Sequence, residues 1–65
     1  MPLLRSLKRI REERGMTVRQ LSAASGVSTD SLSDFEELRR MASRRTARKL
    51  AEALGVKPDD LAEER

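Results

Sequence analysis

Apolar positions recur at helical spacing along the chain, and glycines separate the successive series. Residues three or four apart share one face of a helix, so we expect a first helix with an apolar face. That face comprises Leu3, Leu4, Leu7 and Ile10. Gly15 follows them and can take the left-handed conformation that ends a helix. No segment alternates apolar and polar residues as a half-buried strand does, so the pattern predicts helices alone.

A second helix is predicted over residues 18–25. Thr17 is followed three residues later by Gln20, and this spacing is typical of a capping box, which bonds the first free backbone N–H groups of a helix. We expect Leu21 and Ala24 to form the buried face of this helix.

A third helix is predicted over residues 29–37, after a corner at Gly26. The glycine ends the second helix, Val27 fills the corner, and Ser28 caps the third helix. The inward positions of the third helix are Leu32 and Phe35. Two short helices that meet at a tight turn around a shared apolar interior form a helix-turn-helix, whose second helix usually enters the major groove of DNA.

A fourth helix is predicted to begin at Ser43 or Arg44 and to end at Gly55. Its inner face is expected to comprise Thr46 or Ala47, then Leu50, Ala51 and Leu54. Pro58 suits the first position of a last short helix, which Leu61 attaches to the core.

The connection between the third and fourth helices contains neither Gly nor Pro. One continuous helix over residues 29–54 is therefore physically possible and would favour an exchanged dimer. Ser43 as a helix cap favours a break, and we predict the compact arrangement. Leu38 and Met41 would then form a small exposed apolar patch that can serve a dimer or a protein partner.

Composition limits what so short a chain can do. At 65 residues there is room for one domain and no deep substrate cavity, so we predict no enzymatic activity. Cys and His are absent, and no metal site or cofactor is expected. No apolar run approaches the roughly 20 residues that span a bilayer, and the start is too charged for a secretory signal. We therefore expect a cytoplasmic protein.

The net charge of +3 conceals an uneven distribution. Residues 16–38 hold Arg19 against four acidic residues, which makes the outer face of the predicted third helix acidic. Residues 39–50 contain no acidic residue and carry Arg39, Arg40, Arg44, Arg45, Arg48 and Lys49. Such a local concentration of positive charge attracts a polyanion.

Over residues 7–61 the chain resembles the Cro or phage-repressor type of helix-turn-helix domain. The resemblance rests on LKRIREERGMT, QLSAASGVS, LSDFE, RTARKLAEALGV and PDDL, in this order and without insertions. It implies an all-α, compact five-helix bundle of the lambda-repressor type. We accordingly expect a single domain over residues 1–65, with the helix-turn-helix core at about 17–37.

The resemblance also implies that helix 2 crosses the DNA backbone, that helix 3 enters the major groove, and that two copies bind paired half-sites. Some positions depart from the usual pattern. Leu38 and Ala42 stand where the family usually has a glycine and a proline, and Val18 stands where a polar residue commonly contacts phosphate. Ser22 replaces a usual alanine.

The candidate DNA-contacting residues lie on the third helix and around it. They are Arg19, Ser28, Thr29, Asp30, Ser33, Asp34, Arg39, Arg40, Arg44 and Arg45. Arginines near the backbone can clamp phosphates, whereas Ser, Thr and Asp can bond base edges. Carboxylates are repelled by phosphate, so the acidic residues are equally interpreted as a solvated helix face. Asp34 can instead orient Arg39, or another arginine, that makes the base contact.

Two further interpretations concern charged residues outside that face. Glu36 is interpreted as structural, with a basic partner. The basic residues of the first helix are expected to cover its surface and to pair partly with Glu12 and Glu13, at little gain in stability.

Together these observations predict a sequence-specific double-stranded DNA-binding protein, a transcriptional regulator that acts as a homodimer. The alternative function is a protein-interaction module on the same fold, suggested by the acidic third helix, Val18 and the apolar pair Leu38 and Met41. A scaffold without a native target remains a third interpretation.

Overall fold

The computed structural model describes residues 3–63, which form five helices and no strand. The helices are α1 (Leu7–Glu13), α2 (Val18–Ser25), α3 (Thr29–Glu36), α4 (Arg44–Leu54) and α5 (Pro58–Ala62). The principal extents of the molecule are 23 × 21 × 19 Å, so it is nearly spherical. The predicted all-α five-helix architecture is confirmed.

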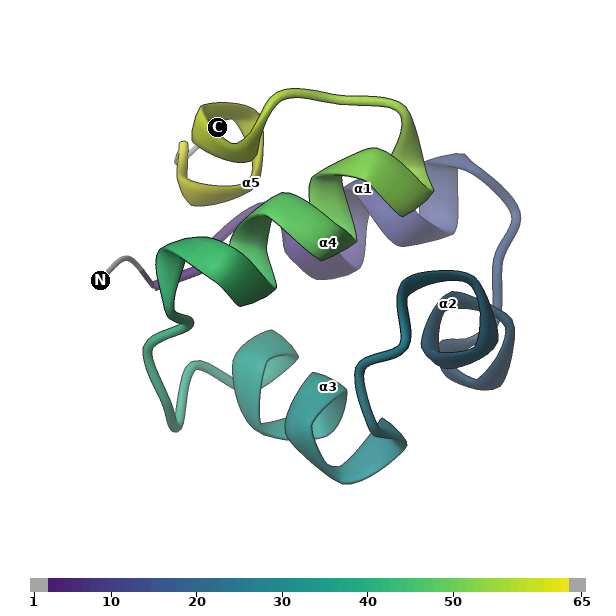
Figure 1. The fold of residues 1–65 in the computed structure, drawn as a ribbon, viewed down its shortest axis with the longest axis horizontal. Helices are drawn as coiled ribbons and strands as arrows, with labels where there is room; N and C mark the ends of the chain where they lie inside the picture. Colours follow the sequence, from purple (N-terminus) through teal and green to yellow (C-terminus); the bar gives the residue numbers. More distant parts are fainter. Residues whose placement is uncertain (1–2, 64–65) are drawn as a thin grey trace.

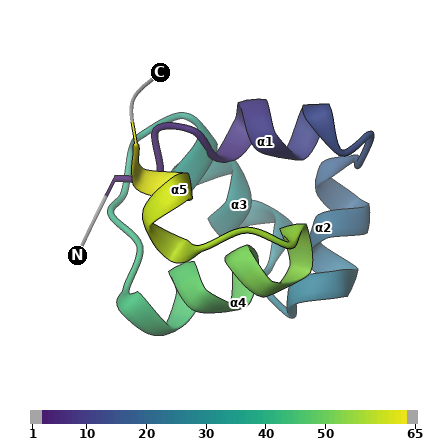
Figure 2. The same cartoon turned by 90° about the horizontal axis from the view of Figure 1, so that it is seen from above.

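α4 is the central element of the fold. It packs against α2 and α5, while α3 packs against α1 and α2 (Figure 1). Seen from above, α1 and α4 lie on opposite sides of the molecule, with α2 at one end and α5 at the other (Figure 2). Every helix contributes to one core, formed by Leu4, Leu7, Ile10, Leu21, Val27, Leu32, Phe35, Ala42, Ala47, Leu50, Ala51, Leu54 and Leu61.

The helices begin where the sequence predicts capping side chains. Thr17 accepts a hydrogen bond from the Gln20 backbone at 3.1 Å, and the Gln20 side chain accepts one from the Thr17 backbone at 2.8 Å. The Ser28 and Ser43 hydroxyls each accept from the backbone N–H three residues ahead, at 3.2 and 3.1 Å. These bonds satisfy N–H groups that a helix leaves free at its start.

The turn of the helix-turn-helix depends on Gly26. This residue has φ +76°, a left-handed conformation that strains residues with a Cβ atom. Val27 follows and is buried, as predicted. The direction of α3 relative to α2 is thus set by one backbone conformation and one apolar side chain.

α3 and α4 are separate helices, so the continuous helix over residues 29–54 does not form. Leu38 takes φ +59° although it is not a glycine. Its N–H donates to the Phe35 carbonyl at 3.2 Å, and the Arg39 N–H donates to the Asp34 carbonyl at 2.9 Å. This pair of bonds is a Schellman motif, in which a left-handed residue reverses the chain and satisfies the last carbonyls.

Several sequence-based expectations about the helices need correction. Ala24 is exposed rather than buried, because α2 directs only Leu21 fully into the core. α1 begins at Leu7, so Leu3 and Leu4 precede the helix, although Leu4 is buried. α3 ends one residue earlier than predicted, at position 36. Ala42 was not predicted in the core, yet it is completely buried.

The two ends of the described chain are joined. The Ser6 N–H donates to the Leu61 carbonyl at 2.9 Å, and the Ser6 hydroxyl donates to the Glu63 carbonyl. Ser6 is 2% exposed, so these bonds satisfy a buried polar side chain. They hold α5 against the segment that leads into α1.

Candidate nucleic-acid interface

The outer face of α3 is polar because its apolar residues, Leu32 and Phe35, both point into the core. The opposite positions are three or four residues apart and share the outward surface. Of these, Thr29, Asp30, Ser33 and Glu37 are exposed, and Asp34 is half-buried. These outward residues therefore share one surface, with Ser28 at its N-terminal end as the helix cap.

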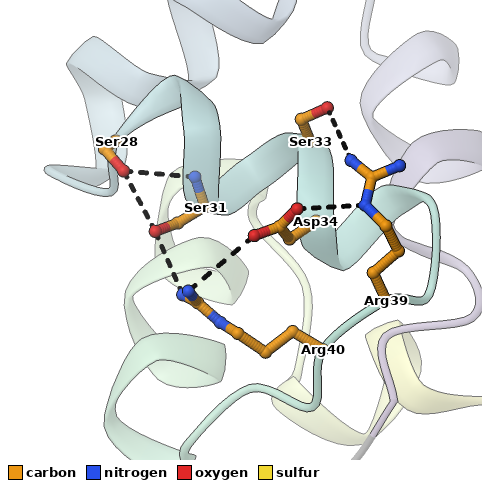
Figure 3. Close-up of polar contacts among 6 residues, drawn as sticks. All are labelled: Ser28, Ser31, Ser33, Asp34, Arg39 and Arg40. Carbon is orange, nitrogen blue, oxygen red and sulfur yellow. Dashed lines mark hydrogen bonds and ion pairs between the residues drawn. The ribbon is translucent and has the colours of Figure 1, made fainter.

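Asp34 lies between two arginines from the loop after α3 (Figure 3). Arg39 Nε donates to Asp34 Oδ1 at 3.1 Å, while Arg40 Nη1 lies 3.9 Å from Asp34 Oδ2. Each carboxylate oxygen thus faces a different guanidinium group. The interpretation that Asp34 orients Arg39 agrees with this geometry.

Arg40 contacts Ser31 and the Phe35 ring in addition to Asp34. Its Nη2 donates to Ser31 Oγ at 3.0 Å, and its guanidinium carbon lies 4.8 Å from the centre of the Phe35 ring. The Ser28 hydroxyl also donates to Ser31 Oγ, at 3.0 Å, so the start of α3 and the loop are joined through serines. A cation above an aromatic face is attracted by its electron density.

Sequence analysis did not identify Ser31 as a site residue. It is half-buried, and it connects Ser28 with Arg40. Nine residues separate Ser31 from Arg40, and only the chain reversal at Leu38 brings them together. The one local signal was the spacing of three residues between Ser28 and Ser31, which is the spacing of a cap and its partner.

The remaining candidate arginines are exposed. Arg44 and Arg45 occupy the first turn of α4, and Arg19 lies near the start of α2. Within residues 3–63 these three side chains have no hydrogen bond or ion pair, so their donors face water. Cations are unfavourable at a helix N-terminus, where the backbone dipole is positive. The first turn of α4 therefore carries two arginines and no acidic residue to offset them.

Arg11 and Glu36 form a buried ion pair between α1 and the end of α3. Arg11 Nε and Nη2 donate to the two Glu36 oxygens at 2.6 and 3.1 Å, and Nη1 donates to the Met16 carbonyl at 2.6 Å. The hydrogen bond that Arg11 donates to Glu36 raises the pKa of Arg11 above its ordinary value. The structural role predicted for Glu36 is confirmed, whereas Arg11 does not cover the surface of α1. Arg9 does pair with Glu13, at 2.9 Å.

The sequence model of the helix-turn-helix family matches residues 7–61. The chain belongs to the helix-turn-helix family, of the Cro/C1 type. The match begins at the first residue of α1 and ends at Leu61 in α5, so it includes most of the five-helix domain. No curated protein matches the chain.

Membership of the helix-turn-helix family supports a DNA-binding role in transcription regulation. The members of this family are DNA-binding regulator domains, and it is not an enzyme family. Within it, α2, the turn at Gly26 and α3 form the motif itself. None of the helices in residues 3–63 has the length and apolar character to cross a membrane.

Proposed function

We propose that this helix-turn-helix protein binds double-stranded DNA sequence-specifically and regulates transcription, with α3 in the major groove. The observation that carries the proposal is the position of Arg39 and Arg40 on either side of Asp34. An acidic recognition helix opposes binding, because carboxylates and phosphates repel. Two cations beside the central carboxylate of that helix reduce this repulsion.

In this proposal the arginines around α3 set the position of the domain on the duplex. Arg40, Arg44 and Arg45 donate to phosphates next to the groove, and Arg19 does so from α2. Guanidinium groups suit this role because their N–H groups form paired bonds to phosphate oxygens. Thr29, Asp30 and Ser33 lie on the exposed surface of α3, where they can bond base edges.

Binding as a homodimer to two half-sites is part of the proposal. A two-fold dimer of such domains requires half-sites about one helical turn apart, roughly 10 base pairs. A duplex with two selected half-sites at this spacing should bind two chains cooperatively. Moving one half-site by about half a turn should abolish the cooperativity, because the second domain would face the opposite side of the duplex.

Salt dependence tests the phosphate contacts. Four contacts give a slope near −3.6 in a plot of log affinity against log salt, so affinity should fall about 100-fold from 50 to 200 mM salt. Arg44→Ala with Arg45→Ala should reduce the slope by about 2. The matched control is Arg48→Ala with Lys49→Ala, which removes the same charge from exposed positions further along α4 and should leave the slope nearly unchanged.

The alternative function is a protein-interaction module. One observation favours it: Leu38 and Met41 are 40% and 52% exposed, and among residues 3–63 they are the exposed large apolar side chains. If the protein binds no duplex from a random pool even at 20 mM salt, the DNA proposal fails and this alternative is favoured. Retained duplex binding by Leu38→Ser with Met41→Ser would show that the patch is not needed for it.

A further inference from the structure

We propose that Arg39 recognises a guanine and that Asp34 is the positioning residue that holds Arg39 for this contact. The inference rests on the proposed function and deepens it, because it assigns the base contact to Arg39 and names the base. Asp34, on the helix, would not bond a base, whereas Arg39, in the loop after α3, would bond the guanine.

The backbone already fixes Arg39 beside Asp34. The left-handed Leu38 reverses the chain, and the Arg39 N–H donates to the Asp34 carbonyl at 2.9 Å. The side chains of the two residues are also bonded, because Arg39 Nε donates to Asp34 Oδ1 at 3.1 Å. Arg39 Nη2 lies 3.4 Å from Ser33 Oγ. The backbone bond and the two side-chain contacts together favour one orientation of the Arg39 guanidinium.

The contacts leave one edge of the Arg39 guanidinium available. A guanidinium has five N–H groups, and those on Nε and one on Nη2 point to Asp34 and Ser33. Nη1 has no hydrogen-bond partner within the described residues, and the side chain is 57% exposed. The free edge, formed by Nη1 and the other N–H of Nη2, has the two-donor geometry that matches guanine O6 and N7 in the major groove.

Arg40 does not offer the same edge. Its Nη2 donates to Ser31, its guanidinium lies over the Phe35 ring, and its Nη1 faces Asp34. Arg39 lies instead on the Ser33 side, next to the exposed residues of α3 (Figure 3). Of the two arginines beside Asp34, Arg39 is therefore placed to extend the contact face of the helix.

Asp34 itself is poorly suited to bond a base. A base that approached the Asp34 carboxylate would compete with two guanidinium groups, because Arg39 donates to Oδ1 and Arg40 lies 3.9 Å from Oδ2. The carboxylate charge also lowers the affinity for any duplex, because it repels phosphate. Asp34 would thus weaken binding overall. Because it orients the Arg39 guanidinium, it would contribute to specificity at the expense of affinity.

The test is selection of bound duplexes from a random pool by the unaltered protein and by the variants Asp34→Asn and Arg39→Ala. We expect the unaltered protein to enrich a motif with a guanine that Arg39→Ala no longer selects. Asp34→Asn should bind unselected duplexes more tightly, yet its preference for this guanine should fall about tenfold. Loss of folding would lower both the affinity for unselected duplexes and the preference for the guanine. A positioning role raises the first and lowers the second, so the two explanations are distinguishable.

Glu52→Gln is the matched control, because it removes one negative charge from an exposed position on α4, outside the contact face of α3. It should raise affinity for unselected duplexes and leave the guanine preference unchanged. Replacing the selected guanine by 7-deazaguanine, which lacks the N7 acceptor, should weaken binding of the unaltered protein about tenfold and that of Arg39→Ala hardly at all.

Two outcomes would overturn the assignment in different ways. If the unaltered protein enriches no sequence, the proposed function fails and the assignment fails with it. If it enriches a motif that Asp34→Asn or Arg39→Ala leaves unchanged, DNA binding stands and only the roles given to Arg39 and Asp34 are wrong.

Discussion

At the scale of single residues, Arg11 and Glu36 show how a charged pair can act as a structural contact. The Glu36 side chain is 6% exposed and the Arg11 side chain 11%, and every Arg11 nitrogen has a hydrogen-bond partner. Burying charges is costly, and complete hydrogen bonding offsets that cost. The pair ties the first helix to the end of α3, directly before the residues proposed to contact DNA.

Arg11→Met should lower the free energy of unfolding by about 3 kcal/mol, because it leaves the Glu36 carboxylate buried without a partner. This is a large part of the roughly 3–10 kcal/mol expected for a domain of this length. Urea denaturation followed by circular dichroism measures it. Arg11→Met with Glu36→Leu should recover most of the loss, and equal instability of the double variant would contradict the argument.

The pH dependence of this pair follows from the pKa of Arg11. Because that pKa is raised in the folded state, the stabilisation is complete below the pKa of the unfolded chain and is lost as the pH rises through the raised value. The difference in stability between the unaltered protein and Arg11→Gln should therefore not decline as pH rises from 7 to 10. Thermal unfolding at a series of pH values tests this, and a decline within that range would contradict it.

At the scale of elements, the break between α3 and α4 positions both arginines of the candidate interface. Leu38 ends α3 in the conformation that favours glycine, and the Ser43 cap starts α4. Without this reversal, Arg39 and Arg40 would continue along a helix, and neither could fold back to Asp34.

Leu38→Gly should be more stable than Leu38→Ala by about 1 kcal/mol. Both variants remove the same exposed apolar side chain, but only alanine keeps the Cβ that disfavours φ +59°. Their urea midpoints give the comparison directly. Equal midpoints would mean that the left-handed conformation of this residue costs nothing in the folded protein.

Ser43→Ala should lower the free energy of unfolding by about 1 kcal/mol, because the Thr46 N–H loses its acceptor at 3.1 Å. Ser22→Ala in α2 is a suitable control, since this half-buried serine caps no helix. Its effect should stay within about 0.5 kcal/mol. Similar losses from both substitutions would argue against a special role for the cap.

At the scale of the whole molecule, stability depends on a single core to which every helix contributes. The radius of gyration is 9.9 Å, and a domain this small buries only about 60% of its unfolded surface. α5 is the shortest element, yet Leu61 is fully buried and its carbonyl accepts from Ser6. The last helix therefore closes the core against α1 and α4.

Leu61→Ala should lower the free energy of unfolding by about 2–5 kcal/mol, the usual range for a truncated core leucine. Differential scanning calorimetry should show the whole transition shifting to lower temperature, because the domain has one core. Met41→Ala, which truncates an exposed side chain, should leave the transition within a few degrees. A separate early transition in Leu61→Ala would show that α5 unfolds independently.

Local signals predicted most of the fold correctly. The caps at Thr17, Ser28 and Ser43 and the stop at Gly26 depend on neighbouring backbone groups, so residue spacing suffices to find them. The exposure of Ala24 was missed because a short helix of small residues has no sharp apolar face. The pairing of Arg11 with Glu36 was missed because 25 residues separate them, and a basic helix offers several equivalent partners.

The sequence by itself determined the helices, their order and the turn at Gly26, because these follow from interactions within a few residues. Only the tertiary structure decided that Arg11 meets Glu36 and that Arg40 joins Arg39 at Asp34. The acidic face of α3 and the basic segment after it are both visible in the sequence, but their combination depends on the reversal at Leu38. A left-handed leucine has no reliable local signal, since the surrounding packing must offset its strain. That reversal sets both Arg39 and Arg40 against Asp34.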